Sequence, residues 1–409
     1  MKRVFSSVAI VLLAAIFWTS CGGGSNNKTN TKTLTNVKDR LFVSNAQQGI
    51  IQIVDVDKDE LAGFETGTTN VFNILVGGSP QFMDSTPDNK NIAVYDNSAF
   101  SVNVMSSNTE TLTSRVLLSG PSDSIRITSD AKFVYAAVRN RNNGTGIQLG
   151  AVQVMDVTNQ TIPTSYPVPN ARWLALSHDN KTLLVFPDDP NNTPYMVDLT
   201  AASPAAAPIP PLVNNAFDRP IAAYFSSDDS KAYILNCGPE CGGAQASITE
   251  LTISTLAQRN VPVPAATVGV LDGTNLYVAG QTASGGMVSV VDTGAMAVNS
   301  SAAIGNGFHN VMRFQSGKAW IGASSCGGGG CLSVFDPSGG SVVVDNPPTG
   351  TSSKGDVTGM DFESSNNEMY VCEGGELLPY DTSGNPVHTN VDIVGKAWDV
   401  RAVPPITKQ

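Results

Sequence analysis

Charged side chains are scarce in this sequence: they make up 14% of 409 residues, against about 25% in typical soluble domains. Beyond the N-terminus no Lys/Arg cluster occurs, and the net charge is −11. Contacts to nucleic-acid phosphates need clustered cations, so nucleic acid is not expected as a partner. Only three histidines are present, and G-x-S-x-G, H-E-x-x-H and a phosphate-binding glycine loop are missing. The sequence therefore contains no recognisable catalytic motif, and we expect neither a metal nor a cofactor.

Strong helix-forming residues are sparse as well. Gly and Pro are frequent, with 38 and 24 copies, and Ser, Thr and Asn are abundant. This composition is typical of an all-β fold with many turns. A chain of this length would ordinarily form two or three domains, but a repeat architecture can make a single domain of it.

One short motif looks like a metal site. Asp55, Asp57 and Asp59 alternate in IVDVDKDE (53–60), as at the start of an EF-hand calcium loop. Glu60 stands where that loop needs glycine, and Thr66 stands where it needs a bidentate glutamate. The same order of apolar strand, Asp and small residues recurs at Asp156, Asp198, Asp292, Asp336 and Asp381. The recurrence predicts a structural turn after each strand rather than a calcium site.

A second pattern precedes these turns. In seven segments an apolar strand, a short polar turn and another apolar strand follow one another: 81–96, 124–138, 173–186, 221–235, 268–280, 311–323 and 358–371. Their starts lie roughly 40–50 residues apart, which is the length of a four-stranded propeller blade. We label the strands of a blade A to D from the axis outward, so that each segment is an A–B hairpin.

The two ends of the repeat complement each other. LFVSN (41–45) is a strand B without a strand A before it, and GKAWDVRAVP (395–404) is a strand A without a strand B after it. Pairing them would close the ring and remove its open edges. We therefore predict a β-propeller over 37–405 with eight four-stranded blades, the C-terminal strand completing the first blade. Seven blades is the alternative, if the weak segment 169–213 is irregular.

The repeat resembles that of the YVTN β-propeller family. LFVSNAQQGIIQIVDVDKDEL (41–61) and LYVAGQTASGGMVSVVDTGAM (276–296) are the nearest matches to it. The similarity extends loosely over 37–405, although no copy spells YVTN and one blade has LLVFPDD instead. The resemblance implies a propeller architecture and does not define a function.

The N-terminus has the features of an export signal. Lys2 and Arg3 precede an apolar segment, 8–18, that is too short to span a membrane. The following WTSC resembles a bacterial lipobox, with Trp18 in place of the usual Leu, and the resemblance implies cleavage before Cys21 and lipidation of its thiol. An ordinary secretory signal is the alternative.

The organisation that follows is a signal peptide over 1–20, a lipidated Cys21 with a flexible tether over 21–36, and the propeller over 37–405. Gly22 is not the Asp that marks inner-membrane retention in enterobacterial lipoproteins. We therefore expect a protein of the cell envelope that is lipid-anchored in the outer membrane, on its periplasmic or surface side.

Export would place the cysteines in an oxidising compartment, where disulfides form. If Cys21 is lipidated, five of the six cysteines remain. Cys237 and Cys241 lie close together in NCGPECGG, and Cys326 and Cys331 in SCGGGGC, so we predict two local disulfides in an oxidising compartment. A zinc site is the alternative, although the spacing is irregular and no His is near. Cys372 is then left as a free thiol.

Propeller geometry places the B–C and D–A loops on one face, here called the loop face. The A–B turns on the other face, the turn face, are short and alike, whereas the B–C loops vary and carry both predicted disulfides. Variable loops on a rigid scaffold are a common site of binding. The starts of the A strands bring charged residues toward the axis on the loop face, and these are the candidate ligand-binding residues: Asp123, Arg172, Arg219, His309, Asp356 and Lys396.

Two functions remain open. The first is a membrane-tethered monomer that binds a protein, a glycan or a small polar ligand through the loop face. The second is a lactonase-like hydrolase that acts on a small polar substrate at the axial mouth, a chemistry found among propellers similar to the YVTN family. Hydrolysis would need a metal or several carboxylate and imidazole groups that meet at the axis. The sequence does not identify the ligand.

Overall fold

The computed structural model describes residues 34–35, 37–63, 72–139, 150–188, 193–211, 217–326, 330–344, 355–387 and 390–406. The predicted signal peptide, the lipidation site Cys21 and almost all of the tether lie outside these residues. The chain divides into two units, Met1–Leu34 and Thr35–Gln409, and the second is the propeller.

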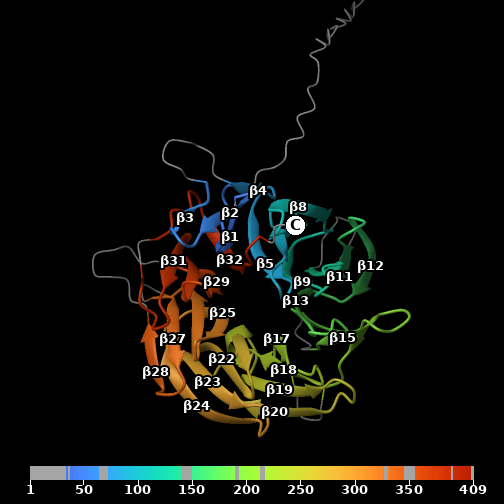
Figure 1. Cartoon of the computed structure of the whole chain (residues 1–409). Coiled ribbons are helices and arrows are strands. Elements are labelled where there is room, and N and C mark those ends of the chain that lie inside the picture. Colours follow the sequence, from blue (N-terminus) through green and yellow to red (C-terminus); the bar gives the residue numbers. More distant parts are fainter. Residues whose placement is uncertain are drawn as a thin grey trace, which may run out of the picture. The chain divides into compact units, whose positions relative to one another are not determined.

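Eight antiparallel sheets stand around a common axis in this second unit (Figure 1). The A strands, nearest the axis, are β32 (Ala397–Val403), β5 (Pro80–Ser85), β9 (Ser122–Ile127), β13 (Ala171–Leu176), β17 (Pro220–Phe225), β21 (Val268–Asp272), β25 (Phe308–Gln315) and β29 (Val357–Glu363). The B strands are β1 (Arg40–Asn45), β6 (Asn91–Asp96), β10 (Phe133–Val138), β14 (Thr182–Pro187), β18 (Lys231–Asn236), β22 (Asn275–Thr282), β26 (Lys318–Ser324) and β30 (Glu368–Glu373).

The outer half of each blade is less regular. The C strands are β2 (Ile50–Asp55), β7 (Ser101–Ser106), β11 (Ala151–Asp156), β15 (Tyr195–Asp198), β19 (Ser247–Thr252), β23 (Gly285–Asp292), β27 (Leu332–Asp336) and β31 (Glu376–Tyr380). The D strands are β3 (Glu60–Leu61) with β4 (Asn73–Leu75), β8 (Thr111–Leu117), β12 (Thr161–Pro167), β16 (Ala206–Pro208), β20 (Gln258–Pro262), β24 (Ala297–Ile304) and β28 (Ser341–Val344). In the last blade, two isolated bridges from β31, Leu377 with Val391 and Tyr380 with Pro386, stand in place of strand D.

The prediction of an eight-bladed propeller is confirmed. Seven blades was the alternative if segment 169–213 proved irregular. This segment contains the four-stranded sheet β13-β14-β15-β16. Closure is confirmed as well, because β32 pairs with β1 in an antiparallel register that runs from Arg40 opposite Val403 to Asn45 opposite Ala397. The last strand of the chain thereby becomes the inner strand of the first blade.

A buried ion pair reinforces this closure. Arg40 on β1 is paired with Glu110, which follows β7 in the next blade, at 2.6 Å, and their side chains are 0% and 2% exposed. Arg40 also donates to the carbonyl of Pro404, just beyond β32, at 2.7 Å. Thr35 donates to Glu110 from both its amide and its hydroxyl. These contacts, here called the closure clasp, join the start of the propeller, its second blade and its C-terminal strand.

Apolar side chains fill the spaces between neighbouring blades. All six residues of β1 and of β2 are buried, because both faces of the middle strands pack against adjacent blades. One cluster, for example, joins Val54 and Val400 of the first blade to Tyr370 and Leu377 of the last. The B and C strands therefore read as continuous apolar runs, which is the pattern that made the repeat visible in the sequence.

The inner strands have free edges that face the axis, and side chains of the preceding blade cover several of their amides. Asp399 accepts from the amide of Met83 at 2.8 Å, and Asp84 accepts from that of Ile127 at 2.8 Å. The hydroxyl of Tyr224 accepts from the amide of Gly269 at 2.9 Å. These contacts satisfy edge donors that would otherwise be unpaired, and they link the blades concerned to their neighbours.

The recurrent Asp residues form turns, as predicted. Asp156 accepts from the amide of Asn159 at 2.8 Å, and Asp336 accepts from that of Ser338 at 2.9 Å. These hydrogen bonds hold the pKa of both carboxyl groups below its usual value. Asp55 is paired with Lys58 at 3.1 Å.

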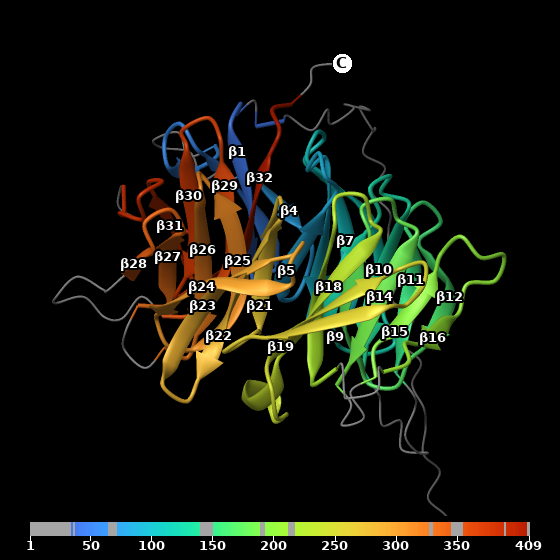
Figure 2. The same cartoon turned by 90° about the horizontal axis from the view of Figure 1, so that it is seen from below.

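The two faces of the ring differ in their loops. The 3₁₀ helix η1 (Gly238–Cys241) lies in the loop between β18 and β19, at the lower edge in Figure 2, and marks the loop face. Within the described residues no helix is long and apolar enough to cross a membrane.

Candidate functional site

A cavity of about 180 Å³ opens on the loop face near the axis. It is lined by Arg172, Trp173, Pro187, Asp188, Arg219, Pro220, Ile221, Cys241 and Phe308. These residues come from β13 and the end of β14, from the start of β17, from η1 and from β25. We call it the loop-face cavity; it brings together two of the six predicted binding residues, Arg172 and Arg219.

Arg172 is held by several partners. Its guanidinium stacks over the ring of Trp173, 4.2 Å from the ring centroid. It donates to Asp188 at 2.7 Å, and its Nε lies 3.5 Å from Asp123. Asp123 is also paired with Arg139. Nε of Arg172 is nevertheless buried without a hydrogen-bond partner within the described residues, so one donor of the group remains unsatisfied.

The backbone around Arg219 is constrained. Its φ of 57° is left-handed, an uncommon conformation for a residue other than glycine. Its carbonyl accepts from the amide of Cys237, the first residue of the disulfide. Neighbouring Asp218 accepts from the amides of Ala244 and Gln245, both at 2.7 Å. Asp218 thus ties the loop that follows η1 to the start of β17, a role that the sequence analysis missed.

Both predicted disulfides are present, Cys237–Cys241 and Cys326–Cys331, and Cys372 is a buried free cysteine. The first disulfide places Cys241 in the wall of the loop-face cavity. Between its cysteines, Glu240 accepts from the amide of Gln281 in the next blade at 2.8 Å, and burial raises the pKa of its carboxyl group. The loop therefore bridges two blades beside the cavity.

His309 does not line the cavity. It is 1% exposed, and its Nε2 lies 3.0 Å from the carbonyl of Gly305. Burial lowers the pKa of His309 to about 4, so the ring is neutral at pH 7. A register shift on β25 between His309 and Val311 accompanies this arrangement. The neighbouring Phe308, 43% exposed, faces the cavity instead.

The remaining predicted residues lie apart from the cavity walls. Asp123 contacts Arg172 but is not among the lining residues. Asp356 is exposed and accepts from the amide of Ser325 at 2.7 Å. Lys396 is exposed, with its Nζ 5.1 Å from the centroid of the Trp398 ring.

The sequence analysis overlooked a second set of polar residues, on the middle of the A strands. Each is paired with the third residue of its B strand, so they occupy equivalent positions around the axis: Asp84, Arg126, Tyr224, Arg313, Asp361 and Arg401. We call them the axial ring. The signal was a charged or polar residue at the same position in six of the eight A strands.

Two arginines of the axial ring are paired with carboxylates on one side of the axis. Arg401 is bonded to Asp399 at 2.7 Å, and Arg313 lies 3.8 Å from Asp361. Burial and the neighbouring Arg401 lower the pKa of Arg313. Burial raises the pKa of Asp399 although Arg401 opposes the shift.

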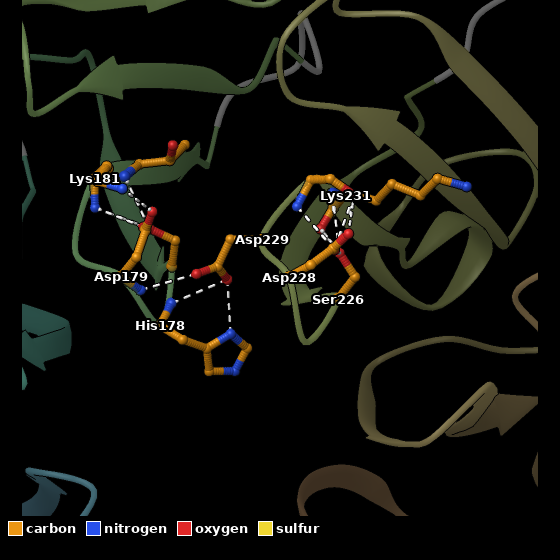
Figure 3. A network of polar contacts seen from close by, with 10 residues as sticks. His178, Asp179, Lys181, Ser226, Asp228, Asp229 and Lys231 are labelled. Atoms are coloured by element: carbon orange, nitrogen blue, oxygen red, sulfur yellow. Dashed lines mark hydrogen bonds and ion pairs between the residues drawn. The ribbon is translucent and has the colours of Figure 1, made fainter.

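On the other side of the axis a larger cavity, about 420 Å³, opens toward the turn face. Arg126, Ala175, Ala223, Tyr224 and Val270 line it, and we call it the turn-face cavity. His178 stands at its rim. Its Nδ1 lies 2.7 Å from Asp229, which also accepts from the amides of His178 and Asp179 (Figure 3).

Comparisons with known proteins identify the fold alone. No family model matches the chain, and no curated protein matches it. The dihydro-heme d1 dehydrogenase NirN, solved in complex with DHE, superimposes with a TM-score of 0.62 at 13% identity over 91% of this chain and 76% of its own.

Two further solved structures resemble the chain to a similar degree. A protein of unknown function from Desulfotomaculum acetoxidans DSM 771 has a TM-score of 0.56 at 14% identity, over 90% of this chain and 99% of its own. The Dos1 propeller has a TM-score of 0.57 at 13% identity, over 78% of this chain and 85% of its own. At such identities the likeness supports a shared propeller fold and no shared activity.

Proposed function

We propose that this propeller is a membrane-tethered, extracytoplasmic binding protein of the YVTN type that recognises a glycan through the loop-face cavity. The observation that carries the proposal is the combination of Arg172, Asp188 and two aromatic rings in that cavity. The β-propeller supplies a rigid frame, and the disulfide-braced loop beside the cavity reduces the ordering cost of binding.

The chemistry of the cavity suits a sugar better than a simple anion. Arg172 is already paired with Asp188 and lies near Asp123, so a bare anion would find this guanidinium partly neutralised. The guanidinium offers donors and the carboxylate of Asp188 offers acceptors, which is what hydroxyl groups require. Trp173 and Phe308 supply apolar faces against which the C–H side of a sugar ring can pack.

The size of the cavity limits the ligand. At about 180 Å³ it is smaller than the roughly 300 Å³ of pockets for drug-sized molecules. We therefore propose that it holds one sugar ring, the terminal unit of a glycan or an exposed unit within one, while the neighbouring loops contact the rest.

The proposed location rests on the N-terminal sequence. A lipid on Cys21 would anchor the chain in the outer membrane, and the polar segment 22–36 would span only roughly 20 Å root-mean-square. The propeller would stay near the membrane and could still turn its loop face toward a surface glycan.

Binding is favoured over hydrolysis by the geometry. The sequence left a lactonase-like hydrolase open, although Asp123, His309 and Asp356 were too few and too dispersed in the sequence to be assigned a catalytic role. The described residues contain no group of three or more His, Cys, Asp or Glu placed to hold a metal ion. Asp123, His309 and Asp356 do not line the cavity. Its arginine, carboxylate and aromatic side chains suit the binding of a sugar.

The proposal is tested with a glycan array probed with the purified full-length protein, followed by titration of the best ligand. Replacing Arg172 and Arg219 with Ala should weaken binding at least about tenfold, because hydrogen bonds to charged groups contribute roughly 1.5–3 kcal/mol each. The matched control is Lys132→Ala with Lys181→Ala, which removes two cations from exposed turns, where their side chains are 69% and 63% exposed.

Two results would overturn the proposal. One is an array without any saturable ligand, and the other is equal loss of binding in the control. The tether is tested separately by fatty-acid labelling of cells that express wild type or Cys21→Ser. Label on both proteins, or on neither, would contradict lipidation at Cys21.

A further inference from the structure

The turn-face cavity lies along the same strands as the loop-face cavity but at their other ends. β13 contributes Arg172 and Trp173 to the loop-face cavity and Ala175 to the turn-face cavity. β17 likewise contributes Ile221 to the first and Ala223 to the second. No lining residue is shared, so the two cavities are separate sites on one pair of blades.

Small side chains create the space. In the blades of β13 and β21 the axial-ring position holds Ala175 and Val270, paired with Leu184 and Tyr277. In the blades of β25 and β29 the same position holds Arg313 and Asp361, which are larger and pair with each other. The cavity of about 420 Å³ beside Ala175 and Val270 is in the range of natural small-molecule sites.

Arg126 is the exception among the three axial arginines. Arg313 and Arg401 each have a carboxylate within 4 Å. In the described part of the chain Arg126 has no such partner, and its NH1 donates only to the carbonyl of Ile125 at 2.9 Å. The guanidinium of Arg126 is partly buried and has five N–H donors. Most of these donors are therefore available to solvent or to a ligand.

Tyr224 offers a second donor in the same cavity. Its hydroxyl oxygen accepts from the amide of Gly269 at 2.9 Å, and among the described residues nothing accepts its proton. Burial raises the pKa of this phenol, although the charges of Arg126 and Arg313 lower it. The hydroxyl therefore stays protonated at pH 7. Leu176, Phe225 and Leu271 add apolar walls.

We propose that the turn-face cavity binds a small carboxylate with an apolar body. Arg126 pairs with the carboxylate, Tyr224 donates to it, and the apolar part lies against Leu176, Phe225 and Leu271. An arginine fork matches a carboxylate in two parallel hydrogen bonds. The apolar walls favour a carboxylate with an apolar body over a small, fully hydrated anion. This site is independent of the glycan site proposed above.

The test uses benzoate and hexanoate as probes, with benzamide and hexanamide as neutral counterparts of the same shape. Binding to the full-length protein is measured by calorimetry or by ligand-observed NMR. We expect saturable binding of at least one carboxylate and at least about tenfold weaker binding of its amide, because only the charged form pairs with Arg126.

Three variants locate the site. Arg126→Gln should weaken carboxylate binding by about ten- to a hundredfold, whereas Lys132→Gln, which removes one cation from the same blade, should leave it unchanged. Ala223→Leu keeps Arg126 but fills the cavity, and it should weaken carboxylate and amide alike. The far-UV spectrum and Tm of each variant confirm that it is folded.

The proposal is overturned if neither carboxylate saturates by roughly 10 mM, which corresponds to negligible affinity. It is also overturned if folded Arg126→Gln and Ala223→Leu both bind like wild type. Loss of carboxylate binding has no bearing on the glycan array, so failure of this proposal is distinguishable from failure of the first.

Discussion

The closure clasp should contribute a measurable part of the stability of the propeller. Glu110→Ala removes the carboxylate that faces Arg40, whose side chain is 0% exposed. The guanidinium would then be buried without a counter-charge, and Thr35 would lose its acceptor. Breaking one side of a buried pair typically costs about 3–5 kcal/mol. Over Thr35–Gln409, an unfolding entropy of about 2.1 cal/mol/K per residue converts this loss into roughly 4–6 °C in Tm.

The assay is thermal and guanidinium unfolding of wild type and variants at pH 7. Glu60→Ala is the control, since Glu60 forms an exposed pair with Lys58 at 3.8 Å and should change stability by less than about 0.5 kcal/mol. The double variant Arg40→Met/Glu110→Leu should recover more than half of the loss, because it removes the buried charge together with its partner. A loss below about 1 kcal/mol in Glu110→Ala would refute the reasoning.

Three further predictions follow from closure, burial and the cysteines. Deleting 395–409 removes β32 and exposes the edge of β1, so the truncated protein should aggregate or unfold; an unchanged Tm would show that closure is dispensable. Non-reducing peptide maps should show Cys237–Cys241 and Cys326–Cys331, with Cys372 alkylated only after unfolding, whereas rapid alkylation of the native protein would contradict its burial. His309 has a folded-state pKa of about 4 against an ordinary 6.5, so the unfolded state binds the extra proton and stability is lost as pH falls from 6.5 to 4. The loss should reach about 3 kcal/mol relative to His309→Gln, and parallel pH profiles of the two proteins would count against it.

The architecture was predictable because apolar strands recur with a regular period. The B and C strands pack on both faces, so each blade repeats the same apolar pattern. A strand B without a partner at one end of the repeat and a strand A without a partner at the other indicated that the two pair. The outer strands were harder to place. They are short and exposed, as in β16 and β28, and the last blade has two isolated bridges in place of strand D. Weak burial leaves a weak sequence pattern.

The candidate site was predictable only in part. Arg172 and Arg219 could be placed because they lie at the loop-face ends of β13 and β17, where the cavity opens. His309 was misplaced, because β25 presents its first residue, Phe308, to the cavity while His309 is buried. Arg126, Tyr224 and Arg313 were missed for another reason. They lie far apart in the sequence, and only the closed ring brings them to a common axis.

The central claim, that the loop face carries the ligand, is tested most directly by hydrogen–deuterium exchange of the full-length protein with and without its best array glycan. Binding at the loop-face cavity should slow exchange in 218–221 and 236–246, which contain Arg219 and the loop held by Cys237–Cys241. Exchange in the turns 177–182 and 226–231 should stay unchanged. Protection confined to those turns would place the glycan on the opposite face and contradict the claim.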